Sequence, residues 1–171
     1  MSNSEIQVGN LTFQFDPSAW AGQYDQWAFY RNQFQNKCGR SNKAVDIVCV
    51  YNQTTWLIEV KDYRRHSPQK PSELPEDVAS KVRDTLAGLV AARFNANDRQ
   101  ERQLADLCLR SRRIRVVFHL EQPQRHSKLF PRKLDEANVQ DKLRSLLKAV
   151  DPHPRVVNRH SLSAALPWIV T

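Results

Sequence analysis

The chain has 171 residues, a size that fits one domain with its own hydrophobic core. Hydrophobic residues make up 40% and charged residues 26% of it, which excludes a disordered chain. No apolar run approaches the roughly 20 residues that span a bilayer, and the first residues lack the pattern of a signal peptide. Three cysteines without a C-x-x-C pair favour a reducing compartment, so we expect a cytoplasmic protein with no membrane partner.

The charge is unevenly distributed along the chain. Lysine and arginine number 26 against 18 acidic residues, for a net charge of +8. Residues 1–60 carry a net charge of −1, and residues 61–171 carry +9. Clustered positive charge indicates a phosphate-bearing partner such as nucleic acid, although a solvated basic face gives the same pattern.

The first elements expected are a short strand and a long helix. Leu11–Phe15 alternates apolar and polar residues, as a strand does. Asp16 and Pro17 are typical of a helix start. Aromatic residues then recur every three or four positions, so we expect one helix to run from this start to about Lys37.

A β-hairpin is expected next. Ala44–Tyr51 and Thr54–Asp62 are rich in Val, Ile, Thr and aromatic residues, which favour strands. Asn52-Gln53 between them suits a two-residue turn, although the usual glycine is absent.

The second half of the chain alternates helices with strands. The expected elements are a loop over 66–75, a helix from Pro75 to Phe94–Asn97, a helix over Arg99–Ser111, a strand over Ile114–Leu120, a polar loop over 121–133, a helix over Asp135–Val150 and a strand over Arg155–Asn158. This order predicts a mixed α/β fold with helices packed on a sheet. We expect a single domain, with a core over about 17–120 and a C-terminal extension over 121–171.

Three charged residues lie inside the apolar hairpin. With the turn at 52–53, Asp46 is predicted to face Glu59 directly, with Cβ atoms ~4.5–5.5 Å apart. Lys61 lies on the same face of the sheet, diagonal to Asp46. Facing carboxylates repel each other, so either a divalent cation or a shared proton is expected between them. Oxygen ligands of this kind suit Mg²⁺ or Mn²⁺. Nearby cations or a dry site would lower the pKa of Lys61, which could then help to activate water. A plain surface cluster of ion pairs is the alternative.

This arrangement resembles the PD-(D/E)XK nuclease superfamily. Asp46, a twelve-residue spacer and then Glu59-Val60-Lys61 match its motif, on a central hairpin flanked by helices. The resemblance covers roughly residues 17–120 and implies a restriction-endonuclease-like fold that hydrolyses phosphodiester bonds with Mg²⁺. It implies that Asp46, Glu59 and the Val60 carbonyl bind the metal, and that Asp46, Glu59 and Lys61 are catalytic. Val45 departs from the pattern, because the family usually has proline there. The further acid that the family often carries on its first helix is matched only by Asp25.

Several basic residues are candidates for nucleic-acid contact. Arg64 and Arg65 follow the second hairpin strand, and Arg113 and Arg115 begin the next strand. Arginine grips phosphate with two parallel hydrogen bonds, although a solvated basic turn is the alternative. Four more basic residues lie in the following loop: Arg125, Lys128, Arg132 and Lys133. Lys81 and Arg83 are interpreted as solubilising surface residues of their helix.

These features together predict a Mg²⁺-dependent endonuclease that acts on DNA. A single domain leaves little room for a module that reads sequence, so we expect a homodimer or a targeting partner protein. The alternatives are a catalytically silent nucleic-acid-binding or assembly subunit on the same fold, and a structural α/β domain with a basic surface.

Overall fold

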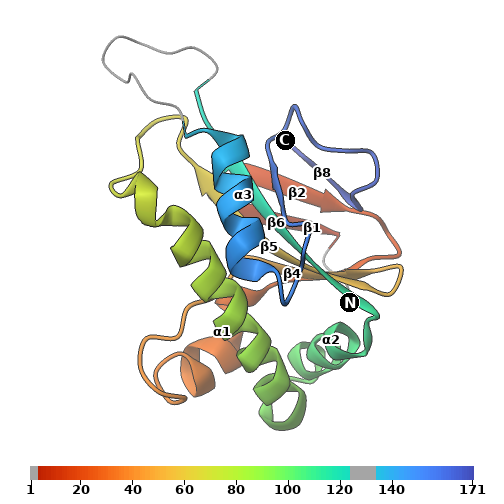
Figure 1. The fold of residues 1–171 in the computed structure, drawn as a ribbon. Coiled ribbons are helices and arrows are strands. Elements are labelled where there is room, and N and C mark those ends of the chain that lie inside the picture. The colour runs from red at the N-terminus through yellow and green to blue at the C-terminus, as the bar shows by residue number, and fades with distance from the viewer. Residues whose placement is uncertain (1–3, 124–133) are drawn as a thin grey trace.

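The protein has a mixed α/β fold in three layers, seen in a computed structural model that describes residues 4–123 and 134–171 (Figure 1). A central five-stranded sheet carries the helices on one face and a separate three-stranded sheet on the other. Both faces of the central sheet are therefore covered, which explains why its strands are apolar on both sides.

The central sheet has the strand order β3-β4-β5-β6-β7. β3, β4 and β5 are antiparallel neighbours, whereas β5, β6 and β7 run parallel. The strands are β3 (Trp20–Gln23), β4 (Ile47–Tyr51), β5 (Thr54–Asp62), β6 (Arg113–Glu121) and β7 (Arg155–Val157).

Three α-helices pack on one face of this sheet. They are α1 (Leu74–Asn95), α2 (Arg99–Arg110) and α3 (Glu136–Leu147). Asp98 and Asp135 cap α2 and α3, because each carboxylate accepts two backbone N–H groups of the first turn. The short helical turns are η1 (Tyr24–Gln26), η2 (Tyr30–Phe34) and η3 (Pro71–Glu73).

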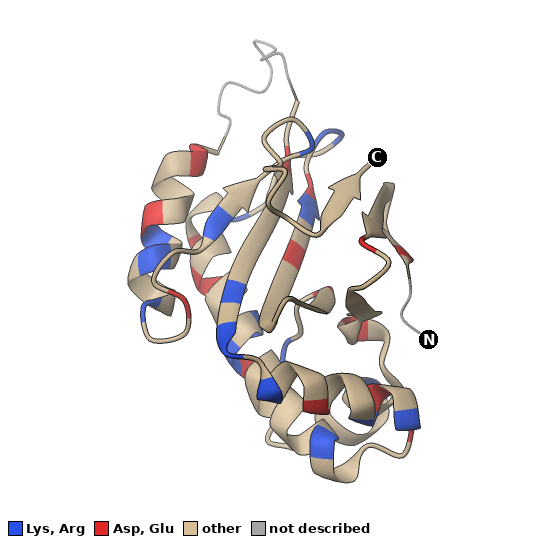
Figure 2. Cartoon of the chain, turned by 90° about the vertical axis from the view of Figure 1, so that its right-hand side faces the viewer, with Lys and Arg blue, Asp and Glu red and all other residues tan. Residues whose placement is uncertain are grey.

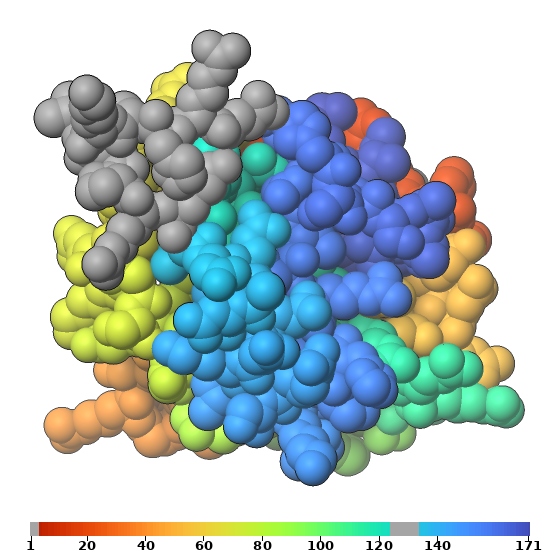
Figure 3. Space-filling view, turned by 45° about the horizontal axis from the view of Figure 1, so that its top comes forward, coloured from red at the N-terminus to blue at the C-terminus, as the bar shows by residue number. Residues whose placement is uncertain are grey.

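The smaller sheet joins the two ends of the chain on the opposite face. Its strands, in the order β1-β2-β8, are β1 (Glu5–Val8), β2 (Leu11–Phe15) and β8 (Trp168–Val170). Phe13 and Trp168 are buried between this sheet and the central one. In the space-filling view, α3 and the C-terminal segment lie side by side on one face of the molecule (Figure 3).

The long helix expected from Asp16 to Lys37 is wrong. The chain forms β3, then η1, and becomes helical again only near η2. The aromatic spacing suggested one helix, but Trp20–Gln23 pairs with β4 as an edge strand of the central sheet. Long-range pairing overrides local periodicity here. Gly22 leaves room for its neighbours, because a Cβ atom there would lie 2.9 Å from the Leu104 side chain.

Most other elements are confirmed to within a few residues. The sequence predicts the positions of the hairpin, α1, α2, β6, α3 and β7. It does not predict β1 or β8. Two apolar residues of these helices, Val90 on α1 and Leu146 on α3, are exposed. Among the described residues, no helix is long and apolar enough to cross a membrane.

Candidate functional site

The hairpin turns where the sequence predicts, so the predicted register of the two strands is confirmed. Tyr51 pairs with Thr54 and Ile47 pairs with Ile58 across β4 and β5. Asn52 and Gln53 both adopt positive φ angles, of 45° and 57°. Two successive positive values are typical of a type I′ turn, whose twist suits a hairpin.

Asp46 lies just before β4 and contacts the partner strand through its side chain. Its Oδ2 accepts a hydrogen bond from the backbone N–H of Val60 at 2.7 Å. Glu59 is fully buried on the face of the sheet that α1 covers. The two carboxyl groups therefore lie together beneath α1, as the register predicts.

Two lysines neutralise Glu59. Lys61 Nζ lies 2.8 Å from Glu59 Oε1, and Lys81 Nζ on α1 lies 2.6 Å from the same oxygen. The interpretation of Lys81 as a solubilising surface residue is wrong, because its ammonium group reaches inward to the buried carboxylate. A lysine on the sheet-facing side of α1 could have been suspected, since a buried glutamate needs a partner.

The charges in this cluster shift one another's pKa values. Burial, followed by the negative charge of Glu59, raises the pKa of Asp46 from 3.8 to about 7. Burial alone lowers the pKa of Lys61, but the charge of Glu59 and its hydrogen bond raise it above the usual value. The pKa of Lys61 is therefore raised, whereas a lowered value is expected from the sequence.

Two carboxylate oxygens at this cluster have no hydrogen bond among the described residues. Glu59 Oε2 and Asp25 Oδ1 are both buried. Asp25 belongs to η1 rather than to a long helix, and Glu59 and Lys81 both influence its pKa, which burial raises. The site is thus a group of three carboxyls and two ammonium groups around the buried Glu59; the other four residues are partly exposed.

The four arginines expected to bind nucleic acid do not lie together. Arg64 and Arg65 follow the end of β5, whereas Arg113 pairs with Thr54 at its start, roughly 26 Å away along the strand. Arg64 forms two hydrogen bonds to the Asp62 carboxylate, and Arg115 pairs with buried Asp151 at 2.7 Å. Arg65 and Arg113 are exposed. The basic loop residues Arg125, Lys128, Arg132 and Lys133 lie outside the described residues.

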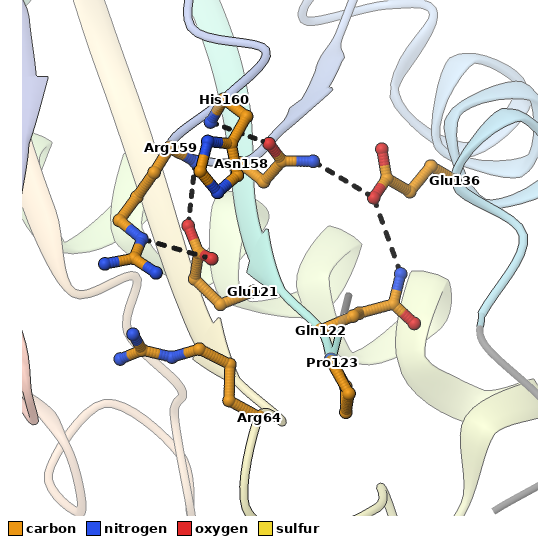
Figure 4. A pocket seen from close by; sticks show the side chains of 8 residues that line it. All are labelled: Arg64, Glu121, Gln122, Pro123, Glu136, Asn158, Arg159 and His160. Atoms are coloured by element: carbon orange, nitrogen blue, oxygen red, sulfur yellow. Dashed lines mark hydrogen bonds and ion pairs between the residues drawn. The ribbon is translucent and has the colours of Figure 1, made fainter. Parts of the chain in front are cut away.

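A cavity of about 450 Å³ lies beside Arg64 (Figure 4). Arg64 and Arg159 project into it from one side, and Gln122 and Glu136 lie opposite. Burial alone would raise the pKa of Glu121, but His119 and the backbone N–H of Arg159 lower it. Because two carboxylates balance the two arginines, the cavity has no strong preference for an anion.

Comparison with known proteins gives one informative similarity. The chain is 36% identical over 164 residues to a cysteine–tRNA ligase of Neisseria meningitidis, an alignment that covers 78% of this chain. The chain spans only 23% of the length of that relative. No family model matches the sequence, and no solved structure matches it.

This similarity contradicts the prediction of an endonuclease. The relative is named for joining cysteine to tRNA, which is not the hydrolysis of a phosphodiester bond. Among the described residues, no group of three or more His, Cys, Asp or Glu side chains is placed to hold a metal ion. The catalytic roles expected for Asp46, Glu59 and Lys61 belong to the nuclease reaction, and we do not propose them.

Proposed function

We propose that this chain is an RNA-binding domain that serves a cysteine–tRNA ligase, with tRNA as its ligand. The similarity to a segment of such a ligase carries the proposal. The net charge of +8 supports it, because a basic domain attracts the phosphates of RNA. RNA replaces the DNA expected from the sequence, and the ligase takes the place of the expected homodimer or targeting partner.

Binding to RNA can be measured directly. Fluorescence anisotropy of labelled tRNA for cysteine, an unrelated tRNA and a DNA duplex of similar length would be followed from 50 to 200 mM salt. We expect both tRNAs to bind more tightly than DNA, with an affinity that falls as salt rises. Absence of tRNA binding at 50 mM salt, or tighter binding of DNA, contradicts the proposal.

The link to the ligase needs its own experiment. Addition of the purified chain to a cysteine–tRNA ligase is expected to lower the KM for tRNA and to leave the KM for cysteine unchanged, because the chain adds affinity for tRNA alone. An unchanged KM for tRNA would show that the chain does not assist that enzyme.

We further propose a restriction-endonuclease-like architecture for the domain, used for binding rather than cleavage. The supporting features are the central hairpin, the parallel pairing of β5 with β6 and the helix α1 that covers the charged end of the hairpin. Fold does not fix function, so this architecture is compatible with a role beside a ligase. A crystal structure with another strand order would contradict it.

The Mg²⁺ or Mn²⁺ site remains a separate proposal. Asp46, Glu59 and the Val60 carbonyl would hold the ion, which would supply positive charge between the two carboxylates. The buried Glu59 Oε2, which lacks a hydrogen bond among the described residues, supports it. We expect 10 mM Mg²⁺ to raise the Tm of the wild type relative to EDTA and not that of Asp46→Asn. Equal Tm values for the wild type in Mg²⁺ and EDTA contradict the site.

A further inference from the structure

An open basic groove lies where α1 ends and α2 begins, away from the Glu59 cluster. It has a volume of about 530 Å³. Phe94 lies thirteen positions after Lys81 on α1, or about 20 Å along the helix axis. The side chains that matter in the groove are Arg93, Phe94, Arg99, Arg102, Asp106 and Arg110. It is therefore a second surface, independent of the buried carboxylates.

Phe94 is the most exposed large hydrophobic residue among those described. Its exposed fraction is 67%, although it sits on a helix whose apolar side is otherwise largely buried. The guanidinium carbon of Arg93 lies 5.5 Å from the centre of its ring, a cation–π contact. An aromatic ring that is held in place and left open to solvent is suited to stack on a flat ligand.

The arginines of the groove outnumber their acidic partners. Four arginines and a single aspartate line it, which leaves three positive charges uncompensated. Asp106 holds Arg93 and Arg110 through their Nε atoms, both at 2.8 Å, so their terminal N–H groups remain available. Arg99 forms no ion pair within the described part of the chain. The groove thus presents oriented guanidinium groups to an anion.

We propose that this groove binds an unpaired nucleotide of RNA, with the base stacked on Phe94 and the flanking phosphates on Arg99 and Arg110. The inference rests on the proposed RNA-binding function and names its contact surface. Aromatic stacking combined with arginine contacts is how proteins bind single-stranded nucleic acid without reading its sequence. An acidic protein segment would match the charge but would leave Phe94 without a flat partner.

The basic surface continues beyond the groove. Arg112 and Arg113 are exposed where α2 leads into β6. Basic residues gather at this corner of the molecule, next to the mixed charges of α2 (Figure 2). An RNA strand that leaves the groove past Arg110 would therefore meet further basic side chains. One of them is Arg113, which the sequence already indicates as a candidate for nucleic-acid contact.

The stacking contact is tested with Phe94→Ala. The matched control is Trp20→Ala, which removes another partly exposed aromatic side chain from a different element. Anisotropy of a labelled 12-nucleotide single-stranded RNA is expected to show about a ten-fold loss of affinity for Phe94→Ala, and little change for the control. A fully paired RNA of the same length should respond less, because its bases are already stacked.

The phosphate contacts are tested with the double variant Arg99→Gln and Arg110→Gln. Arg144→Gln, which removes an exposed arginine of α3 that is paired with Asp141, is the control. For single-stranded RNA, each lost phosphate contact should lower the slope of log affinity against log salt by about 0.7. The control should leave the slope unchanged.

The outcomes separate this inference from the function on which it rests. Loss of single-stranded RNA binding in both groove variants, with both controls intact, supports the groove. If Phe94→Ala, or the double arginine variant, binds single-stranded RNA as tightly as the wild type, the proposed groove is wrong and the RNA-binding function is unaffected. A wild-type chain that binds neither tRNA nor single-stranded RNA overturns both. Circular dichroism confirms that each variant is folded.

Discussion

Lys81 and Arg83 are two residues apart on α1, yet they play different roles. Lys81 contacts the buried Glu59 at 2.6 Å, whereas Arg83 is exposed and lies 3.4 Å from Asp84. Removing one partner of a buried ion pair leaves an uncompensated charge, whereas exposed pairs contribute little. Two basic residues of one helix are therefore expected to contribute very differently to stability.

We predict that Lys81→Met destabilises the protein by about 3 kcal/mol, because Lys61 alone must then neutralise Glu59. Arg83→Met is the matched control and should change the free energy of unfolding by less than about 1 kcal/mol. Urea denaturation monitored by circular dichroism measures both. Equal effects of the two substitutions would show that Lys81 does not stabilise the buried carboxylate.

Asp46 is predicted to make stability depend on pH. Its pKa is about 7 in the folded protein, above the ordinary value of 3.8, so the folded state binds this proton more tightly. Its contribution is therefore fully present below pH 3.8 and is lost as the pH rises towards 7, at up to about 1.4 kcal/mol per pH unit.

The test is the free energy of unfolding from pH 4 to pH 8 in EDTA, for the wild type and for Asp46→Asn. Asparagine keeps an oxygen that can accept from the Val60 N–H but does not titrate. As the pH rises to about 7, the free energy of unfolding of the wild type should fall relative to that of Asp46→Asn. Above pH 7 the difference between the two free energies should become constant. A difference that is flat across this range contradicts the raised pKa.

At the scale of elements, α1 owes its close approach to the η1 region to Gly88. A methyl group at this position would overlap the hydroxyl of buried Tyr24 and would lie 3.3 Å from the Phe34 ring. The Tyr24 hydroxyl has no hydrogen-bond partner among the described residues. Removal of the Tyr24 hydroxyl should therefore lower the stability little, whereas a methyl group that overlaps this hydroxyl should lower the stability much more.

We predict that Gly88→Ala destabilises the protein by about 2 kcal/mol, despite the better helix propensity of alanine. Tyr24→Phe should restore part of that loss in the double variant, since it removes the overlapping oxygen. A double-mutant cycle in urea measures the coupling. Additive effects of the two substitutions would mean that residues 24 and 88 do not contact each other.

At the scale of the whole molecule, β8 joins the end of the chain to its beginning. Trp168 is 3% exposed and packs against Phe15 and Trp56, with ring centres at 5.9 and 5.5 Å. Backbone hydrogen bonds between Thr12 and Thr171 close the same sheet. The small sheet thus covers one face of the central sheet only when both ends of the chain are in place.

We predict that Trp168→Ala costs about 3–5 kcal/mol of stability and reduces the near-ultraviolet circular dichroism of the remaining tryptophans. Ile169→Ala, one residue along the same strand but 60% exposed, should cost less than about 1 kcal/mol. Thermal and urea unfolding compare the two. Similar losses would indicate that β8 does not cover the central sheet.

The sequence by itself determined the local pairings of this protein. The hairpin register followed from a two-residue turn, because strand partners are fixed once the turn is placed. The meeting of Asp46 with Glu59 and Lys61 on one face then followed from the alternation of side chains. α1, α2 and α3 were recognisable because apolar periodicity, and for α1 a proline and acids in the first turn, are signals carried by neighbouring residues.

Only the tertiary structure decided which distant segments meet. The short segment at Trp20–Gln23 is a strand because β4 supplies its hydrogen bonds, and the three residues of β8 depend on β2 in the same way. Lys81 joins Glu59, and the arginines of α2 gather around Phe94, because helices pack where the whole chain places them. Such contacts join residues of different elements, and no local pattern encodes them.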